Sequence, residues 1–375
     1  MKQILKIGTR GSPLALAQAK TVQAKLAQAH PELKTALVVI RTSGDWNPAD
    51  GDVRLSAAQG GKGQFAKEIE QALLSGEIHA AVHSMKDMDS HLPEGLIINH
   101  MLEREDPRDA LLLRERPDRT KSIKNKELAK NSQLKIQGVS AIPQNAIVGT
   151  ASVRRGAALL SKRPDLTIVP FRGNVHTRIN KLRKTDPDNT KQNIACTLLA
   201  VAGMNRLGIT GEADFILEPE DMLPAAGQGA VGIEIPTAHK DTISVFSHIS
   251  HLNTVLCVKS ERAALRTLDG SCHTPIGAYA IRKECEIWLR VCVISLDGKH
   301  RFEDEIHGTA NTIDDAEKLG EEIGLRLKKR IPPEILTQSI ADDPIVVSDS
   351  FPTRNKERKR RNPQPAPAKA GGSDE

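Results

Sequence analysis

Aromatic residues are scarce in this chain: only 2% of its 375 residues are Phe, Trp or Tyr. The cores must therefore be aliphatic, and the chain lacks the stacking surface on which single-stranded nucleic acid usually binds. Apolar residues still make up 39% of the sequence, which is enough to build cores. At this length we expect two or three domains of about 100 to 150 residues each.

Long apolar runs are also missing, since no stretch approaches the ~20 residues that cross a membrane. Residues 1–4 lead directly into an expected strand at Leu5, so we expect no signal peptide. Five cysteines occur without a CxxC spacing, which speaks against a disulfide framework or a zinc site and is typical of a reducing compartment. We expect a cytoplasmic protein with no membrane association and no metal.

The net charge of +6 is local. Residues 114–137 hold eight basic and three acidic side chains, residues 341–375 hold seven and six, and the two stretches account for the whole net charge. The basic cluster at residues 354–361 leaves nucleic-acid binding open as one reading. A solvated loop and a solvated tail explain the same charges, and we expect no nucleic-acid partner.

Strand and helix patterns alternate along the first two thirds of the chain. Ser12 followed by Pro13 is a helix start, and Ser152 precedes a second one. Such alternation is typical of a parallel sheet covered by helices on both faces. The expected elements lie at residues 5–7, 13–29, 36–42, 65–74 and 78–83, and again at 110–113, 146–149, from 152, 167–171 and from 174.

The last third has a different pattern. A helix from about His248 precedes strands at 277–282 and 286–296, and an amphipathic helix covers about 313–329. This part reads as a small α+β domain. Residues 341–375 are rich in proline and charge, so we expect disorder there, and we expect residues 114–145 to be an inserted loop.

Cys272 stands apart from the other cysteines. It lies between Gly270 and Gly277, with Pro275 three residues later, in a run that suits neither a helix nor a central strand. We expect a turn that exposes a reactive thiol. The remaining cysteines are expected to be small structural hydrophobes: Cys196, Cys257, Cys285 and Cys292.

Four further motifs accompany the Cys272 loop: GTRGSPLA at 8–15, HSMKD at 83–87, GTASVRR at 149–155 and RGNVHTR at 172–178. Together they resemble the porphobilinogen deaminases, from about Ile4 to about Ile340. The resemblance implies an α/β fold with two similar doubly wound lobes, like type II periplasmic binding proteins, plus a small α+β domain. The implied division is residues 1–104 with 223–245, residues 105–222, residues 246–340, and a tail at 341–375.

The same resemblance implies a transferase. It would condense four porphobilinogen molecules with loss of ammonia to give hydroxymethylbilane, on a dipyrromethane cofactor held by Cys272 through a thioether. Asp87 would be catalytic and stabilise the cation formed as ammonia leaves, while Lys86 would bind cofactor carboxylates. Lys62 and Phe65 would make loop contacts. The other implied binding residues are Arg10, Ser12, Thr150, Ser152, Arg154, Arg155, Arg172, Gly173, Arg178 and Arg206.

These residue types suit a ligand with several carboxylates, because guanidinium groups bind carboxylates in a bidentate manner and helix N-termini attract anions. Arg154 and Arg155 are adjacent and repel each other, which predicts an anion between them. Lys86 and Asp87, as neighbours in a strand, would point to opposite faces and would not pair.

Some positions depart from the family pattern and put single contacts in doubt: Ala58, Gln64, Ala151 and His176. Gly227-x-Gly229-x-x-Gly232 matches a dinucleotide fingerprint, but an expected strand follows it instead of a helix, so we reject a nicotinamide or flavin site. A two-lobed anion receptor stays open as an alternative, although it would need neither Cys272 nor a third domain. The expected partners are porphobilinogen, its growing chain and a downstream uroporphyrinogen-III synthase, and we expect a monomer.

Overall fold

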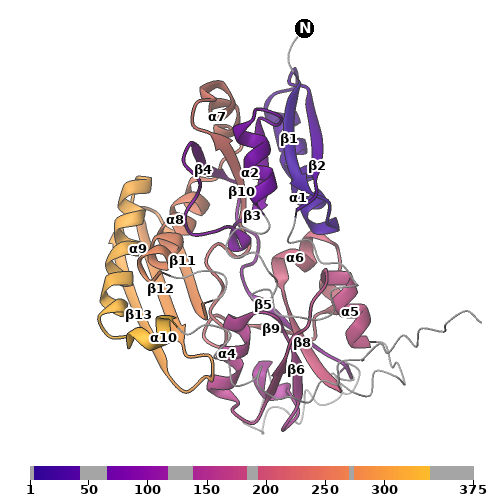
Figure 1. Ribbon diagram of the computed structural model, residues 1–375, viewed down its shortest axis with the longest axis vertical. Coiled ribbons are helices and arrows are strands. Elements are labelled where there is room, and N and C mark those ends of the chain that lie inside the picture. Colours follow the sequence, from indigo (N-terminus) through magenta and orange to yellow (C-terminus); the bar gives the residue numbers. More distant parts are fainter. Residues whose placement is uncertain (1–3, 43–65, 117–137, 184–192, 270–273, 338–375) are drawn as a thin grey trace, which may run out of the picture.

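A computed structural model of the chain describes residues 4–42, 66–116, 138–183, 193–269 and 274–337. Its strands form two sheets of five strands and one sheet of three. Figure 1 shows the five-stranded sheets one above the other, with the three-stranded sheet beside them. No helix among the described residues is long and apolar enough to cross a membrane.

The first sheet has the strand order β2-β1-β3-β10-β4. β1 is parallel to β2 and β3, but β10 is antiparallel to β3 and β4. The expected parallel arrangement therefore holds for β1, β2 and β3 but not for β10, because β10 enters directly from the second sheet and not through a helical crossover. The elements are β1 (Leu5–Arg10), α1 (Pro13–Ala29), β2 (Thr35–Ile40), α2 (Lys67–Leu74), β3 (Ala80–Ser84), β4 (Leu96–Met101), β10 (Val231–Pro236) and α7 (Lys240–Ser247).

The second sheet repeats this plan in the order β7-β6-β8-β5-β9. β6 is parallel to β7 and β8, while β5 is antiparallel to β8 and β9. Each five-stranded sheet thus contains one strand that the chain inserts as it crosses from the other. The elements are β5 (Asp109–Leu113), η4 (Gly138–Ala141), β6 (Ile147–Gly149), α4 (Val153–Lys162), β7 (Thr167–Val169), α5 (Val175–Arg183), β8 (Ile194–Ala200), α6 (Val201–Arg206), η6 (Thr210–Glu212) and β9 (Phe215–Leu217).

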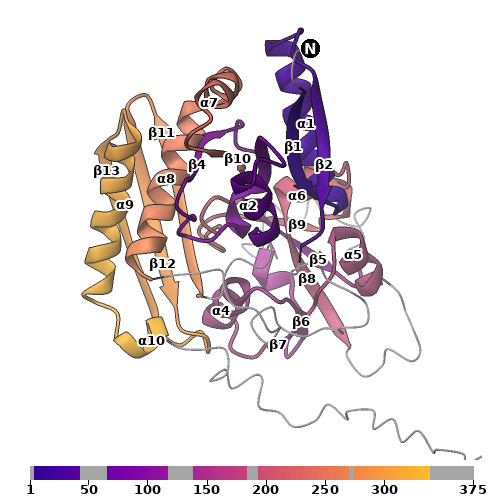
Figure 2. The same cartoon turned by 45° about the horizontal axis from the view of Figure 1, so that its top comes forward.

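The third sheet is an antiparallel meander, β11-β12-β13, with α8 and α9 packed together against it. The two helices approach closely at Gly320, where a Cβ would lie 2.1 Å from the Ser260 carbonyl oxygen. α8 also contacts β4, so it lies between the third sheet and the first, as Figure 2 shows. The elements are α8 (Leu252–Thr267), β11 (Ile276–Lys283), β12 (Glu286–Ile294), β13 (Arg301–Thr309), α9 (Ile313–Lys328) and α10 (Pro333–Thr337).

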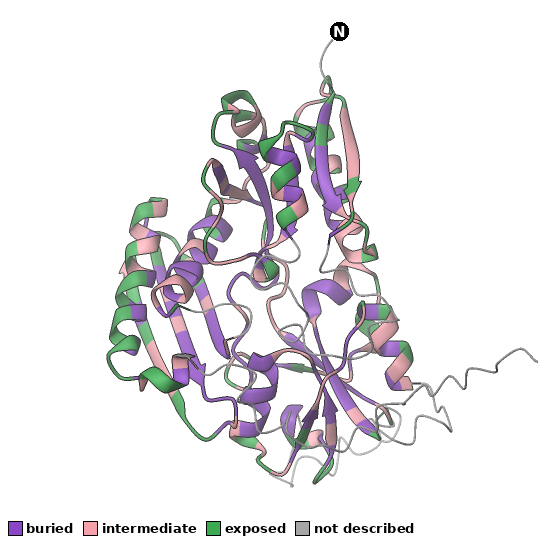
Figure 3. Cartoon of the chain, in the orientation of Figure 1, coloured by how far each residue is buried: buried purple, intermediate pink, exposed green. Residues whose placement is uncertain are grey.

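Helix starts and buried strands follow the sequence expectation closely. Ser12 caps α1 by accepting a hydrogen bond from the Ala15 amide, and Ser152 caps α4. β3, β5, β8 and β10 are mostly buried (Figure 3), and the cores consist mainly of Leu, Ile, Val and Ala. The sequence analysis did not find β4, β9, β13, α6, α7 and α10.

Two chain segments cross side by side between the five-stranded sheets, one before β5 and one before β10. The Glu105 amide donates to the Gly229 carbonyl at 3.2 Å. Gly229 has a φ of +90°, and a Cβ there would lie 2.3 Å from the Glu105 carbonyl oxygen, so no larger residue fits. The glycine run that resembles a dinucleotide fingerprint is therefore a crossing point, and β10 follows it as predicted.

Candidate active site

Lys86 and Asp87 lie in η2 (Met85–Asp87), one turn of 3₁₀ helix directly after β3. The ladder between β3 and β10 ends at the pair Ser84–Val231, and Met85 is buried, so the chain turns before Lys86. The prediction that these two residues are strand neighbours with opposed side chains is wrong for that reason. Lys86 is half-buried and Asp87 is exposed.

Charged residues of the second sheet surround this turn. Burial lowers the pKa of Lys86 to about 8; Asp87 and Asp109 oppose the shift, while Arg155 and Arg178 add to it. Burial likewise lowers the pKa of Arg178 to about 10, with Arg155 acting in the same direction and Asp87 against it. Three cations from η2, α4 and α5 therefore converge at the junction of the two sheets.

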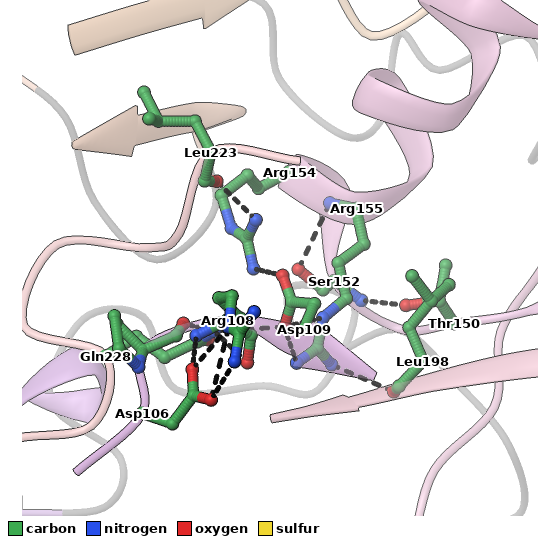
Figure 4. A network of polar contacts seen from close by, with 11 residues as sticks. Asp106, Arg108, Asp109, Thr150, Ser152, Arg154, Arg155, Leu198, Leu223 and Gln228 are labelled. Atoms are coloured by element: carbon green, nitrogen blue, oxygen red, sulfur yellow. Dashed lines mark hydrogen bonds and ion pairs between the residues drawn. The ribbon is translucent and has the colours of Figure 1, made fainter. Parts of the chain in front are cut away.

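Arg154 and Arg155 lie in the first turn of α4, and both guanidinium groups are buried. Arg154 Nη2 lies 2.8 Å from Asp109 Oδ2, and Arg155 Nη2 lies 2.7 Å from Asp109 Oδ1 (Figure 4). Burial alone would raise the pKa of Asp109, but the two arginines bring it below its usual range. The argument that this pair requires a bound anion is wrong, because Asp109 is the anion.

One carboxylate faces two guanidinium groups, so the cluster keeps a net positive charge. Further donors of Arg154 and Arg155 bind the carbonyl oxygens of Leu223 at 2.7 Å and Leu198 at 3.1 Å. Arg154 Nε is buried and has no hydrogen-bond partner among the described residues. Neutral carbonyl groups hold the arginines in place without cancelling their charge.

The remaining predicted residues of the second sheet flank this cluster. Thr150 is buried, and its hydroxyl accepts a hydrogen bond from the Ser152 amide at 3.2 Å. Arg172 is buried as well, directly before Gly173, whose φ of +119° starts the turn into α5. Arg178 Nε is buried with no hydrogen-bond partner in the described part of the chain. The start of α5 therefore holds a guanidinium with unused donor capacity.

Arg10, Ser12 and Arg206 lie where α1 of the first sheet packs against α6 of the second. Arg206 Nη2 donates to the Gly229 carbonyl at 2.6 Å. Burial lowers the pKa of Arg206, and Glu105 opposes the shift. Arg206 is therefore tied to the chain crossing, while Arg10 lies at the end of β1.

Cys272, Lys62 and Phe65 lie outside the described residues, as do Ala58 and Gln64. Of the cysteines that the structure describes, Cys196, Cys257 and Cys292 are buried, and burial raises each thiol pKa to about 12. The expectation that Cys285 is also a buried hydrophobe is wrong: it is exposed, because it lies in the turn between β11 and β12.

Several residues that organise the site were not found from the sequence. Gln228 Nε2 donates to Asp109 Oδ1 at 3.0 Å, and Arg104 Nε donates to the Gln228 carbonyl at 2.8 Å. Arg104 also forms a bidentate ion pair with Glu261 of α8. Asp109 lies at the start of a buried strand, which is the signal that could have marked it as a charge needing partners.

Arg262 of α8 connects the third sheet to the turn of Lys86 and Asp87. Its guanidinium is buried and donates to the carbonyl oxygens of Met85 at 3.3 Å and Met88 at 3.1 Å, and to that of Asp89. Three carbonyls of one turn thus share one cation. The turn is held from α8 and not only by its own sheet.

Comparisons with known proteins find the same family that the sequence motifs resemble. The model of the porphobilinogen deaminase dipyrromethane cofactor-binding domain matches residues 5–244, and that of the porphobilinogen deaminase C-terminal domain matches residues 255–329. A porphobilinogen deaminase of Pelobacter propionicus is 41% identical over 326 residues, covering 87% of this chain and 94% of that protein. A chloroplastic porphobilinogen deaminase of Oryza sativa is 39% identical over 337 residues, covering 88% and 85%.

Among solved structures, the aliphatic sulphonate-binding protein SsuA of Escherichia coli is similar over 100% of this chain and 99% of its own, with 11% identity and a TM-score of 0.36. That score is too low to support an argument about this chain.

Proposed function

The chain belongs to the porphobilinogen deaminase family; it is a transferase of tetrapyrrole biosynthesis that uses a dipyrromethane cofactor, and we propose that its active site is the junction of η2, α4 and α5. It condenses four porphobilinogen molecules head to tail, with loss of ammonia, to give hydroxymethylbilane. The observation that carries the site assignment is the convergence of Lys86, Arg155 and Arg178 beside Asp87.

The residues at this junction fit a ligand that bears carboxylates. Lys86 and Arg178 have lowered pKa values because burial and neighbouring cations disfavour their charged forms. A bound carboxylate reverses both effects, since an opposite charge stabilises the cation. The partnerless Nε of Arg178 supplies a donor for it. When bound, the dipyrromethane supplies the pyrrole α-carbon to which the next pyrrole is joined.

Asp87 is the proposed catalytic residue. It is exposed at the tip of η2, so a substrate pyrrole can reach its carboxylate, and that carboxylate interacts with the cations of Lys86 and Arg178. A carboxylate about 4 Å from a developing cation, at an effective dielectric of about 20, contributes roughly 4 kcal/mol. Asp87 therefore stabilises the positive charge that appears on the pyrrole as ammonia leaves.

The other cations bind carboxylate arms. Arg155 is fixed by Asp109 and the Leu198 carbonyl, so its position is preorganised. We assign Arg154, Arg172, Thr150, Ser152 and Gly173 to the same wall of the site, and Arg10, Ser12 and Arg206 to the opposite wall at the α1–α6 contact. A wall on each sheet gives a growing chain of pyrroles cations on both sides.

We assign cofactor attachment to Cys272. Cys196, Cys257 and Cys292 are excluded as attachment sites, because they are buried and their thiol pKa values are raised. Thiols in apolar surroundings are unreactive. Cys285 is exposed and is the matched control. Intact mass should exceed the sequence mass by two condensed porphobilinogen units in the wild type and in Cys285→Ala, but not in Cys272→Ala, which should be inactive. An unmodified active wild type, or an adduct on Cys285, contradicts the assignment.

We further infer three domains: residues 1–104 with 223–245, residues 105–222, and residues 246–340. We infer a cytoplasmic monomer that passes its product to uroporphyrinogen-III synthase. The molar mass of the native protein, measured by light scattering, tests the monomeric state, and a dimer at micromolar concentration would contradict it.

A further inference from the structure

A second group of titratable residues comes from β3, from β10 and from α2, which contacts both strands. His83 is in β3, two residues before the turn of Lys86 and Asp87 begins, and its Nε2 lies 3.0 Å from Glu234 Oε2 of β10. The His83 side chain is 6% exposed and that of Glu234 is 0% exposed. Neither oxygen of Glu234 receives a hydrogen bond from the described residues. Burying a carboxylate costs free energy unless a hydrogen-bond donor or a cation lies beside it.

The third member of this group, after His83 and Glu234, is Glu70 of α2. Burial raises the pKa of Glu70 to about 7; Glu234 and Asp89 add to the shift, and His83 opposes it. Full ionisation of Glu70 and Glu234 would place two negative charges around one imidazole inside the first sheet. Glu70 therefore keeps its proton to a higher pH than an exposed glutamate does.

Arg262 links this group to the catalytic turn. Its positive charge acts on Glu234 and Asp89, while its donors bind the carbonyl oxygens of Met85, Met88 and Asp89. Burial lowers the pKa of Arg262 to about 10, Arg266 adds to the shift, and Asp89, Glu234 and Glu317 oppose it. A change in the charge of this group therefore alters the electrostatic energy of Arg262, the cation that holds the turn.

We propose that His83, in contact with the buried Glu234 and influenced by Glu70 of α2, acts as a positioning residue for the turn bearing Lys86 and Asp87. The proposal rests on the catalytic role of Asp87 proposed above. Two connections carry it: the backbone from β3 into η2, and the hydrogen bonds of Arg262. The charged groups that act on Glu70 are Glu234 on β10, His83 on β3 and Asp89 after η2. Lys67 and Glu68 are on its own helix, and Arg262 on α8 acts on Glu234.

The test is the pH profile of kcat for the cofactor-loaded enzyme between pH 6 and pH 9. The wild type should show an ionisation near pH 7. Glu70→Gln keeps the shape and is permanently neutral, so it should lack that ionisation. Glu77→Gln removes the same charge from an exposed site just after α2, so it should retain the ionisation. His83→Gln should lower kcat about tenfold with KM changed less than about twofold, because the substrate-binding cations are untouched.

Persistence of the ionisation in Glu70→Gln, or wild-type kcat in His83→Gln across this range, overturns the proposal. Should His83→Gln fail to fold, the comparison of Glu70→Gln with Glu77→Gln still decides. Asp87→Asn reports separately on the catalytic role: near wild-type turnover there would remove Asp87 from catalysis, whatever the Glu70 profile shows.

Discussion

Arg104 and Glu261 form a bidentate ion pair that joins the chain crossing to α8: Nη1 lies 2.5 Å from Oε1 and Nη2 lies 3.1 Å from Oε2. The same carboxylate accepts the Gly227 amide at 2.7 Å and the Ala280 amide at 2.7 Å. One buried carboxylate therefore connects both crossing segments to β11 of the third sheet. Arg262, the next residue, holds the catalytic turn, so α8 fixes both features through adjacent side chains.

Glu261→Gln should destabilise the protein strongly, because it leaves Arg104 buried without its counter-charge. We expect the free energy of unfolding to fall by about 3 to 5 kcal/mol. The matched control is Glu303→Gln, which breaks the more exposed pair with Arg301 and should cost under about 1 kcal/mol. Urea unfolding measures both, and equal losses would mean that the buried pair has no special weight.

Asp109→Asn should unfold more readily than the wild type at pH 7, since it leaves two buried guanidinium groups without an anion. The pKa of Asp109 is lowered in the folded state, so its contribution is present above the unfolded value of about 4 and is lost as pH falls. The variant should therefore lose less stability on acidification than the wild type. Asp221→Asn, on a more exposed pair with Lys162, is the control. Identical acid unfolding curves for wild type and Asp109→Asn would contradict the expectation.

Asp87→Asn should fold and carry the cofactor but turn over about a thousandfold more slowly, the equivalent of roughly 4 kcal/mol in barrier. Because Asp87 is exposed, its stability should change by less than about 0.5 kcal/mol. Single-turnover rates and thermal unfolding measure the two effects. Asp241→Asn, on the remote helix α7, should affect neither.

Lys86 predicts a pH dependence of substrate binding. With a pKa of about 8 it loses its charge as pH rises through that value, so the KM for porphobilinogen should increase above pH 8. Lys86→Arg keeps the cation and should flatten this rise, whereas Lys86→Met should show a high KM throughout. A KM independent of pH from 7 to 9 in the wild type would argue against Lys86 as a carboxylate ligand.

Glu70 should weaken the folded state at neutral pH. Its folded pKa is raised from 4.5 to about 7, so the favourable contribution is complete below the unfolded value and is lost as pH rises through 7. Glu70→Gln should be more stable than the wild type at pH 8, on the order of 1 kcal/mol after allowance for solvent screening. The two proteins should have similar stability at pH 5, and a constant difference across this range would contradict the assignment.

Local sequence patterns were sufficient to predict most of the helices and strands that flank the site. Ser12 before Pro13 and Ser152 before α4 are caps whose side chains satisfy amides of the first turn, an interaction confined to a few neighbouring residues. The order of the motifs at Arg10, Lys86, Arg155 and Arg178 was sufficient for the family resemblance. The sequence analysis missed β13 because this strand is rich in charge, with Glu303, Asp304 and Glu305 in succession, and its alternation of apolar residues is weak.

Only the tertiary structure decided which charges neutralise one another. The sequence determined that Arg154 and Arg155 lie side by side at a helix start, but the anion between them, Asp109, comes from a strand about 45 residues earlier. Likewise, the sequence placed Lys86 beside Asp87, yet the turn that exposes Asp87 is held by Arg262 of α8, 177 residues beyond Met85. Helix caps and strand periodicity arise from interactions between near neighbours, whereas ion pairs across sheets depend on topology, which no local pattern contains.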